Sequence, residues 1–376
     1  MSDIFDGIFG QPRAREFLRA SIASGRVSHA YLFTGPAGSN KTAAAYAFAQ
    51  AILCKDHGCR ACDDCRCIER RKHPDVHFYT PEGAQGYLIE QIREIVSGVS
   101  LAPIRAKGKV YILDRVDLLG VSAANAFLKT LEEPVEGVTF ILLGRTREAV
   151  LPTIVSRCQV VPFRHIPARE AAGILSQKTG VTPEQARIAI EACNGSITRA
   201  MTFAKSAERA EFRARIMEVL SNLPLSDERD VLEYAAELIE RAKAPLDNVR
   251  TQQSEELAES ADFLTKTALK QIELRHKRAL SMATRESLNQ TTSIIRSWLR
   301  DVLMIASGTP DLIVNIDQRE VLQRVAQKVT PASIMSALRE AYKTDETLSY
   351  NVSPETCLDV LLFSIREVLN GSGNPH

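Results

Sequence analysis

The residues best suited to chemistry form a glycine-containing loop at positions 35–42, which reads Gly-Pro-Ala-Gly-Ser-Asn-Lys-Thr. An apolar run, 29–33, precedes this loop and an alanine-rich stretch follows it. Strand, loop and helix in this order direct backbone N–H groups at a phosphate. Lys41 would reach the outer phosphates of a nucleotide, and the hydroxyl of Thr42 would bind Mg²⁺. We therefore expect a nucleotide site formed by Gly35, Gly38, Asn40, Lys41 and Thr42; the alternative is a surface turn with a solvated lysine.

Three further positions decide what such a site would do. A second expected strand ends in Asp114, and an aspartate there holds Mg²⁺ directly or through a water. Asn40 replaces the second glycine of the pattern and tolerates a left-handed backbone. Its side chain falls where the backbone approaches phosphate, so we expect ATP and Mg²⁺ to bind weakly or not at all. Hydrolysis needs an acceptor that orients water, but Arg115 follows Asp114 and has only donors; Asp117 is a remote substitute.

Five of the eight cysteines fall between positions 54 and 67. Four of them are spaced as C-x₄-C-x₂-C-x₂-C, and these are Cys54, Cys59, Cys62 and Cys65. Four thiolates on one short loop are enough to close a tetrahedral, structural Zn²⁺ site. His57 and Cys67 are further candidate ligands, and disulfides are the alternative chemistry. The tight spacing favours a metal over disulfides, and with four protein ligands no position stays open for catalysis.

Composition and charge limit the classes of function. The chain has 376 residues, of which 45% are hydrophobic and 25% charged, with a net charge of +1. These values are typical of a globular chain of two or three domains, and they argue against a sequence-independent grip on nucleic acid by overall charge. No apolar run approaches the roughly 20 residues of a membrane span. The first residues do not resemble a secretory signal, so we expect a cytoplasmic protein.

The pattern of strands and helices predicts how these residues are positioned. Up to about position 163, β-rich runs alternate with helical stretches, as in an α/β sheet domain. Strands are expected at 31–33, 76–80, 109–114, 138–143 and 160–161, and helices at 43–53, 88–99 and 122–133. After Pro167 the strand patterns end. Three short helices are expected up to position 206, one with a capped start at Thr182, and the remaining chain is helical.

Several segments resemble the bacterial clamp-loader subunits of the AAA+ superfamily. Residues 124–134, Ala-Asn-Ala-Phe-Leu-Lys-Thr-Leu-Glu-Glu-Pro, are similar to a helix signature of that family, and Thr153-Ile-Val-Ser-Arg-Cys158 is similar to its Ser-Arg-Cys motif. The cysteine cluster resembles its zinc module, although the gap before the second cysteine is shorter. Residues 5–11 resemble its adenine-side segment. The segments at 298–303 and 351–355 resemble its collar domain, so the likeness spans nearly the whole chain.

The resemblance implies a fold, partners and a location. It implies an AAA+, RecA-like parallel-sheet domain at 1–165 with a zinc module at 54–67, a helical lid at 166–206 and an all-α collar at 207–376. The implied partners are gamma/tau and delta subunits in a hetero-pentameric ring of the DNA polymerase III holoenzyme. Through that ring they include a sliding clamp and primed DNA. The implied location is the cytoplasm, in association with the nucleoid.

Departures from the family pattern indicate the type of subunit. The active motor subunits carry a glycine at Asn40, a glutamate at Arg115, a polar sensor at Gly144 and an arginine at Thr198. All four are altered here, which is similar to the non-hydrolysing member of the ring. The resemblance makes Arg157 an arginine finger for a neighbour's ATP, since a planar guanidinium stabilises the charge that develops on the γ-phosphoryl group. An internal salt bridge is the alternative.

Three functions therefore remain. The leading one is a catalytically silent scaffold that activates a neighbouring ATPase during sliding-clamp loading in DNA replication. The second is an ATP-hydrolysing motor subunit of the same family. The third is a zinc-dependent nucleic-acid-binding module, disfavoured by the near-zero charge and few aromatic residues. Lys129 and Arg145 are candidate contacts to duplex phosphates, or ordinary solvated residues.

Overall fold

The computed structural model describes residues 3–83, 86–260, 266–348 and 353–371. By contacts the chain divides into two compact units, one formed by Met1–Gly180 with Gly195–Arg199 and the other by Val181–Asn194 with Ala200–His376. The helices expected to form a lid are thus shared between the two units. The three-part division at 165 and 206 stays a prediction.

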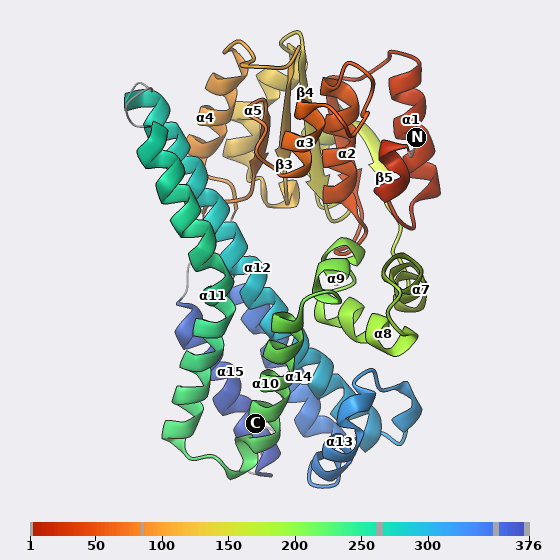
Figure 1. Ribbon diagram of the computed structural model, residues 1–376, viewed down its shortest axis with the longest axis vertical. Helices are drawn as coiled ribbons and strands as arrows, with labels where there is room; N and C mark the ends of the chain where they lie inside the picture. Colours follow the sequence, from red (N-terminus) through yellow and green to blue (C-terminus); the bar gives the residue numbers. More distant parts are fainter. Residues whose placement is uncertain (1–2, 84–85, 261–265, 349–352, 372–376) are drawn as a thin grey trace. The chain divides into compact units, whose positions relative to one another are not determined.

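The first unit is built on a five-stranded parallel sheet (Figure 1). Its strands lie in the order β2-β3-β4-β1-β5, and every neighbouring pair is parallel. Their bounds are β1 Ala30–Thr34, β2 Val76–Tyr79, β3 Lys109–Leu113, β4 Val138–Gly144 and β5 Gln159–Pro162. The three central strands are buried along their whole length, which explains why they read as continuous apolar runs. The predicted α/β class and all five predicted strands are confirmed.

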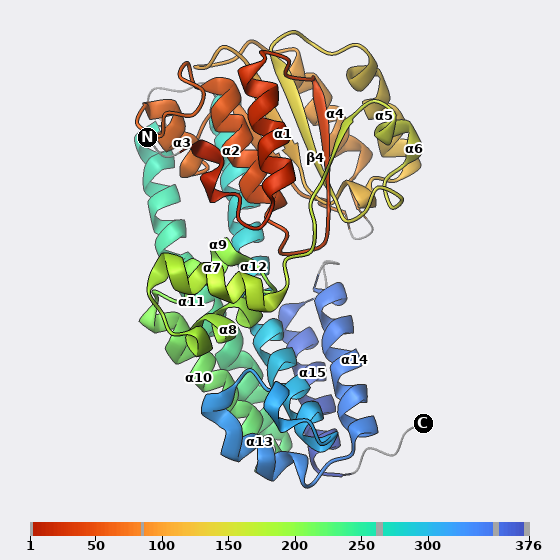
Figure 2. The same ribbon diagram turned by 90° about the vertical axis from the view of Figure 1, so that its right-hand side faces the viewer.

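Helices cover both faces of this sheet (Figure 2). One face carries the short 3₁₀ helix η1 (Ile4–Gly7), α1 (Pro12–Ala23), α2 (Lys41–Leu53) and α3 (Asp63–Glu69). The opposite face carries α4 (Ile89–Val99), α5 (Val121–Glu132) and α6 (Pro152–Val155). Successive strand residues point to opposite faces. Tyr31 and Phe33 therefore pack under α2, while Leu32 packs on the α4–α5 side.

The region after the sheet is helical, as predicted. Helix α7 (Ala168–Thr179) belongs to the first unit and α8 (Pro183–Ala192) to the second, while α9 (Ile197–Phe203) falls across their boundary. The side chain of Thr182 caps α8 by accepting from Gln185 N at 3.2 Å, and Gln185 Oε1 accepts from Thr182 N at 3.1 Å. This reciprocal capping box confirms the helix start predicted at Thr182.

The described part of the second unit contains helices and no strand. Besides α8 and the end of α9, they are α10 (Ala207–Asn222), η3 (Leu223–Leu225), α11 (Glu228–Ser260), α12 (Lys266–Ala306), η4 (Pro310–Leu312), η5 (Ile316–Gln318), α13 (Arg319–Ala326), α14 (Pro331–Thr347) and α15 (Pro354–Leu369). Helices α11 and α12 lie side by side and antiparallel, and α12 also contacts α8, α10 and α14 (Figure 1). Helix α12 is therefore the central element of this unit.

A buried polar network fastens α12 to its neighbours. The fully buried carboxylate of Asp301 accepts from the backbone N–H groups of Val314 at 2.9 Å and Asn315 at 2.7 Å, and from the Asn315 side chain at 2.8 Å. Arg213 of α10 donates to Asn315 Oδ1 at 2.7 Å and to the carboxylate of Asp317 at 2.8 and 2.9 Å. These bonds satisfy a charge that would otherwise be costly to bury.

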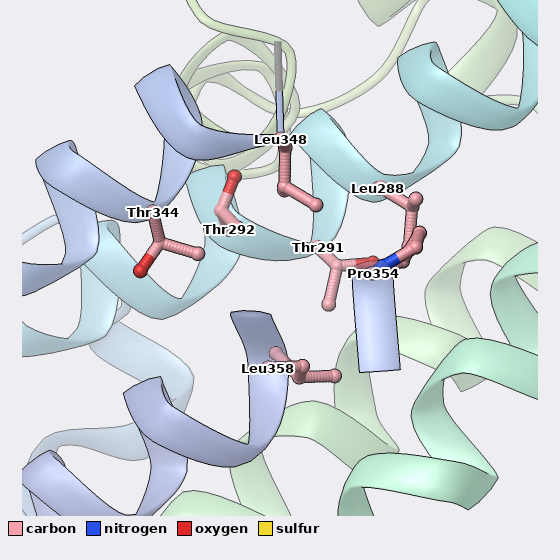
Figure 3. A pocket seen from close by; sticks show the side chains of 7 residues that line it. All are labelled: Leu288, Thr291, Thr292, Thr344, Leu348, Pro354 and Leu358. Carbon is pink, nitrogen blue, oxygen red and sulfur yellow. The ribbon is translucent and has the colours of Figure 1, made fainter. Parts of the chain in front are cut away.

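Figure 3 shows a small cavity between α12, α14 and α15. The side chains that line it are Leu288, Thr291, Thr292, Thr344, Leu348, Pro354 and Leu358. Its volume of about 10 Å³ is at the lower limit for one water molecule, so it is not a ligand site.

Among the described residues, no helix is both long and apolar enough to cross a membrane.

Candidate nucleotide and metal sites

The loop between β1 and α2 has the backbone geometry that a phosphate cradle needs. Gly35 passes so close to Phe163 that a Cβ would lie 2.4 Å from the Phe163 carbonyl oxygen, which only glycine avoids. Gly38 and Asn40 adopt left-handed backbones, with φ of 77° and 66°. Helix α2 begins directly at Lys41, so its free N–H groups and the positive end of its dipole face the loop. The predicted strand–loop–helix order is confirmed.

The ammonium group of Lys41 closes this loop. It donates to the carbonyl oxygens of Gly35 and Pro36, the latter at 2.7 Å, and to Ser39 Oγ at 3.3 Å. Burial lowers the pKa of Lys41 to about 8, while the nearby carboxylates of Asp114 and Asp117 oppose that shift. A half-buried cation thus holds the two ends of the loop together.

Two side chains attach the loop to distant segments. Asn40 Nδ2 donates to the carbonyl oxygen of Phe9 at 3.2 Å. The buried amide of Gln11 donates to the carbonyl oxygens of Ser39 at 3.1 Å and Arg164 at 2.8 Å, and accepts from Arg164 N at 2.9 Å. The sequence did not predict these contacts, because Asn40 and Phe9 are 31 residues apart, Gln11 and Arg164 are 153 residues apart, and no local pattern indicates such distant pairs.

Asp114 lies directly after β3, near the ammonium of Lys41. Its N–H donates to Tyr79 O at 2.8 Å, and its carbonyl oxygen accepts from the Tyr87 hydroxyl at 2.6 Å. Burial raises the pKa of the Asp114 carboxyl, although the Arg115 N–H at 3.0 Å and the charge of Lys41 lower it. Asp114 is therefore held firmly where a Mg²⁺ ligand is expected, and Thr42 lies in the first turn of α2.

Arg115 and Gly144, at the positions expected to orient and sense water in an ATPase, offer no acceptor side chain. Arg115 has a left-handed backbone with φ of 55°, and its buried Nε has no hydrogen-bond partner among the described residues. Gly144 ends β4, and its carbonyl oxygen accepts from Gly35 N at 3.2 Å. Asp117 is engaged by Arg145, whose N–H lies 3.2 Å from its carboxylate and whose Nε lies 4.0 Å away.

The four predicted cysteine ligands come together at the end of α2. All four Sγ atoms lie within 4.8 Å of one another, and the Cys54–Cys59 and Cys54–Cys62 distances are both 3.7 Å. A tetrahedral Zn²⁺ with Zn–S bonds of 2.3 Å requires S–S distances of about 3.8 Å. The cluster is therefore compatible with a structural zinc ion. His57 and Cys67 lie outside it, and none of the eight cysteines, all within the described part, forms a disulfide.

Hydrogen bonds prepare one of these thiols for a metal. Burial raises the pKa of Cys54, but the N–H groups of Cys59, Gly58 and Asp56 outweigh it and lower the pKa to about 6. Burial raises the pKa of the Cys62 and Cys65 thiols. A bound cation would favour the thiolate at each position, because metal coordination deprotonates thiols.

The cysteine loop also contacts the N-terminal segment. A Cβ at Gly58 would lie 2.8 Å from Ile4, and Arg60 donates to the carbonyl oxygens of Asp3 at 2.9 Å and Ile4 at 3.2 Å. Gln50 of α2 donates to Cys65 O at 2.9 Å. The cysteine loop therefore packs against the N-terminal segment, and that segment in turn contacts the phosphate loop.

Arg157 lies in the turn between α6 and β5, with 31% of its side chain exposed. Its Nε donates to Glu132 Oε1 at 3.0 Å, and Nη2 contacts the same oxygen. Its Nη1 donates to Thr153 O at 2.8 Å and to Ser156 Oγ at 3.2 Å. The internal salt bridge considered as an alternative is thus present, and it leaves part of the guanidinium accessible.

The two candidate contacts to duplex phosphates lie on the surface of the chain: Lys129 is exposed on α5, and the side chain of Arg145 is 70% exposed.

Comparison with known proteins agrees with this architecture. Residues 10–167 match the family model "DNA polymerase III, delta subunit", and residues 255–366 match "DNA polymerase III, delta subunit, C terminal". The chain is 33% identical over 212 residues to DNA polymerase III subunit delta' of Bacillus subtilis, which covers 56% of this chain and 64% of that protein. It is 37% identical over 177 residues to subunit tau of the same organism, covering 46% of this chain and 31% of that protein.

A solved DNA polymerase III gamma subunit-related protein of Thermotoga maritima shares 17% identity, with a TM-score of 0.43 over 94% of this chain and 99% of that one. The matches at both ends of the sequence relate the chain to the delta and gamma/tau family of DNA polymerase III subunits. Within that family its similarity is divided between delta' and gamma/tau subunits. The chain spans less than two thirds of the length of either relative from Bacillus subtilis.

Proposed function

We propose that this chain is a delta'-type subunit of a DNA polymerase III clamp loader. In this role it does not hydrolyse ATP, serves as a scaffold, and supplies Arg157 to the ATP of a neighbouring subunit during sliding-clamp loading. Its proposed partners are gamma/tau and delta subunits in a hetero-pentameric ring, and the clamp and primed DNA are reached through that ring. The proposed location is the cytoplasm, in association with the nucleoid.

The observation that carries the proposal is the identity of the residue after Asp114. A water that attacks the γ-phosphate must be oriented by an acceptor, and Arg115 offers donors only. Asp117 is already engaged by Arg145, and Gly144 has no side chain. The cradle formed by Gly35, Gly38, Asn40, Lys41 and Thr42, with Asp114 as the Mg²⁺ ligand, would then hold a nucleotide without cleaving it.

The role of Arg157 is supported by its chemistry and its place. A guanidinium supplied from outside a nucleotide site stabilises the charge that spreads over the γ-phosphoryl oxygens, and such a finger contributes about 10³-fold or more to turnover. The Arg157 side chain is partly exposed, and an exposed ion pair is worth only about 0–1 kcal/mol. Its bonds within this chain therefore do not prevent an approach to a more highly charged triphosphate.

Zinc has a structural role in this proposal. Cys54, Cys59, Cys62 and Cys65 would fill all four positions of the ion, so it offers no open site for a reactant. When bound, it would order a loop too short to form a core of its own.

Two measurements test the proposed function. The purified chain alone should show no steady-state ATP hydrolysis above background. In a reassembled clamp-loader complex, Arg157→Ala should leave assembly intact and slow ATP turnover by about 10³-fold. Arg229→Ala, which removes another exposed arginine that pairs with a glutamate of the same chain, is the matched control and should retain turnover. If Arg157→Ala leaves turnover unchanged, the finger role is lost.

The competing function is that of a gamma/tau-like motor subunit. The 37% identity to subunit tau of Bacillus subtilis and the intact contact between Lys41 and its loop favour it. Brisk hydrolysis by the isolated chain, abolished by Lys41→Ala, would establish this function in place of the scaffold.

A further inference from the structure

We propose that Glu132 positions the guanidinium of Arg157 for the neighbouring subunit's nucleotide. This inference rests on the finger role proposed above and adds a second residue, from a different motif, to the same site. Glu132 is the last residue of α5, in the segment Leu-Glu-Glu-Pro, whereas Arg157 follows α6 25 residues later. The fold thus brings together two segments that sequence similarity treats as separate motifs.

The hydrogen bonds occupy one edge of the guanidinium, formed by Nε and Nη2, and leave the outer Nη1–Nη2 edge less engaged. Glu132 Oε1 accepts from Nε and from Nη2, so the carboxylate occupies the side edge of the planar group. Thr153 O, 2.8 Å from Nη1, supports the same group from the backbone. Nη1 also donates to Ser156 Oγ at 3.2 Å, so four of the five N–H donors of the guanidinium have partners among the described residues. The outer Nη1–Nη2 edge is therefore the edge through which a phosphate would be bound, once the long Ser156 contact gives way.

This arrangement lowers the cost of engaging a phosphate. An arginine side chain has many rotamers, and holding it in one orientation beforehand leaves less freedom to lose when a phosphate binds. A carboxylate on one edge also leaves the remaining donors in a fixed plane, which suits bidentate binding of phosphate oxygens. Glu132 would thus act through Arg157 rather than on the nucleotide itself.

The location of Glu132 supports a dedicated role. The C-terminal end of a helix carries negative partial charge, so a carboxylate in its last turn is unfavourable unless a cation lies nearby. Glu133 and Glu136 add negative charge directly beyond Glu132. The Arg157 guanidinium is the cation paired with Glu132 in the structure. Glu132 lies at an electrostatically unfavourable position and binds a partly exposed arginine. Such a pairing is expected where the orientation of that arginine matters for function.

The test is a double-mutant cycle on the reassembled complex, read as steady-state ATP turnover with kcat and KM determined separately. Glu132→Ala should lower kcat about tenfold with KM for ATP unchanged, since orientation of the finger matters in the transition state. Glu132→Gln keeps the shape and one acceptor, and should fall between Glu132→Ala and the unaltered complex. Glu133→Gln removes the adjacent charge from the same helix end and should leave kcat unchanged.

The decisive comparison uses Arg157→Ala as background. If Glu132 acts through Arg157, the double variant should turn over ATP at the same rate as Arg157→Ala alone. A further loss in the double variant, no loss in Glu132→Ala, or faster turnover in Glu132→Ala would each overturn the positioning role while leaving the finger role standing. If Arg157→Ala has no effect, both the finger and its positioning residue are rejected together.

Discussion

The side-chain amide of Asn40 donates a 3.2 Å hydrogen bond to the carbonyl oxygen of Phe9. Asn40, which replaces the second glycine of the phosphate-loop pattern, therefore links the phosphate loop to the N-terminal segment. The left-handed backbone of Asn40 is tolerated by asparagine better than by most residues, so the loop shape is kept. Asn40 thus adds a contact within the chain at the position where the loop departs from the phosphate-loop pattern.

Loss of this contact should loosen the N-terminal segment. Asn40→Asp preserves size and backbone preference but cannot donate to the Phe9 carbonyl, so we expect a loss of about 1 kcal/mol in the free energy of unfolding. Faster amide exchange at residues 5–11 should accompany it. Asn222→Asp, at another asparagine of the chain, should leave exchange in this segment unchanged. Unaltered exchange in Asn40→Asp would show that the Asn40 contact does not secure the segment.

The half-buried ammonium of Lys41 should make stability depend on pH. Its folded-state pKa of about 8 lies below the ordinary 10.5, so between these values the unfolded chain binds more protons at this residue. Stability of the natural chain relative to Lys41→Met should therefore rise with pH from about 8 to 10.5, by about 1–2 kcal/mol after discounting for partial exposure. Chemical denaturation across this range measures it. A constant difference between the two proteins would refute the shifted pKa.

Zinc content should follow the four clustered cysteines and no others. Cys59→Ser is expected to lose the metal, whereas Cys67→Ser, altered at a thiol outside the cluster, should keep one zinc per chain. Because apparent zinc binding is worth on the order of 10 kcal/mol, chelation should unfold the cysteine loop. Through Arg60 and Gly58 it should also expose residues 3–8 to proteolysis. Equal metal content in the two variants would place the ligands elsewhere.

The second unit should depend on the buried carboxylate of Asp301. Asp301→Ala leaves the N–H groups of Val314 and Asn315 without their acceptor, and we expect a loss of about 2–4 kcal/mol in the stability of this unit. Denaturant titration followed by the single tryptophan, Trp298, reports on this unit. The exposed Asp311→Ala change is the control, and a similar midpoint for both variants would contradict the role of the network.

The elements predicted well from sequence are those whose signal is local. Buried central strands such as β3 and β4 form continuous apolar runs, and the cysteine spacing alone identified the four thiols that meet. Three α-helices of the first unit, α1, α3 and α6, were not predicted. The contacts that define the site are long-range pairs, such as Gln11 with Arg164 and Glu132 with Arg157. Such pairs follow from the order of strands in the sheet, which periodicity does not encode.

Helix α2 starts at Lys41 and ends at Leu53, immediately before Cys54. One rigid rod of 13 residues thus separates the phosphate cradle from the first thiol of the cysteine cluster. Each residue inserted into or deleted from a helix turns its far end by about 100° and shifts it by about 1.5 Å. A change in the length of α2 would therefore misalign the two sites at once. We expect natural variants of this chain to conserve the number of residues in α2.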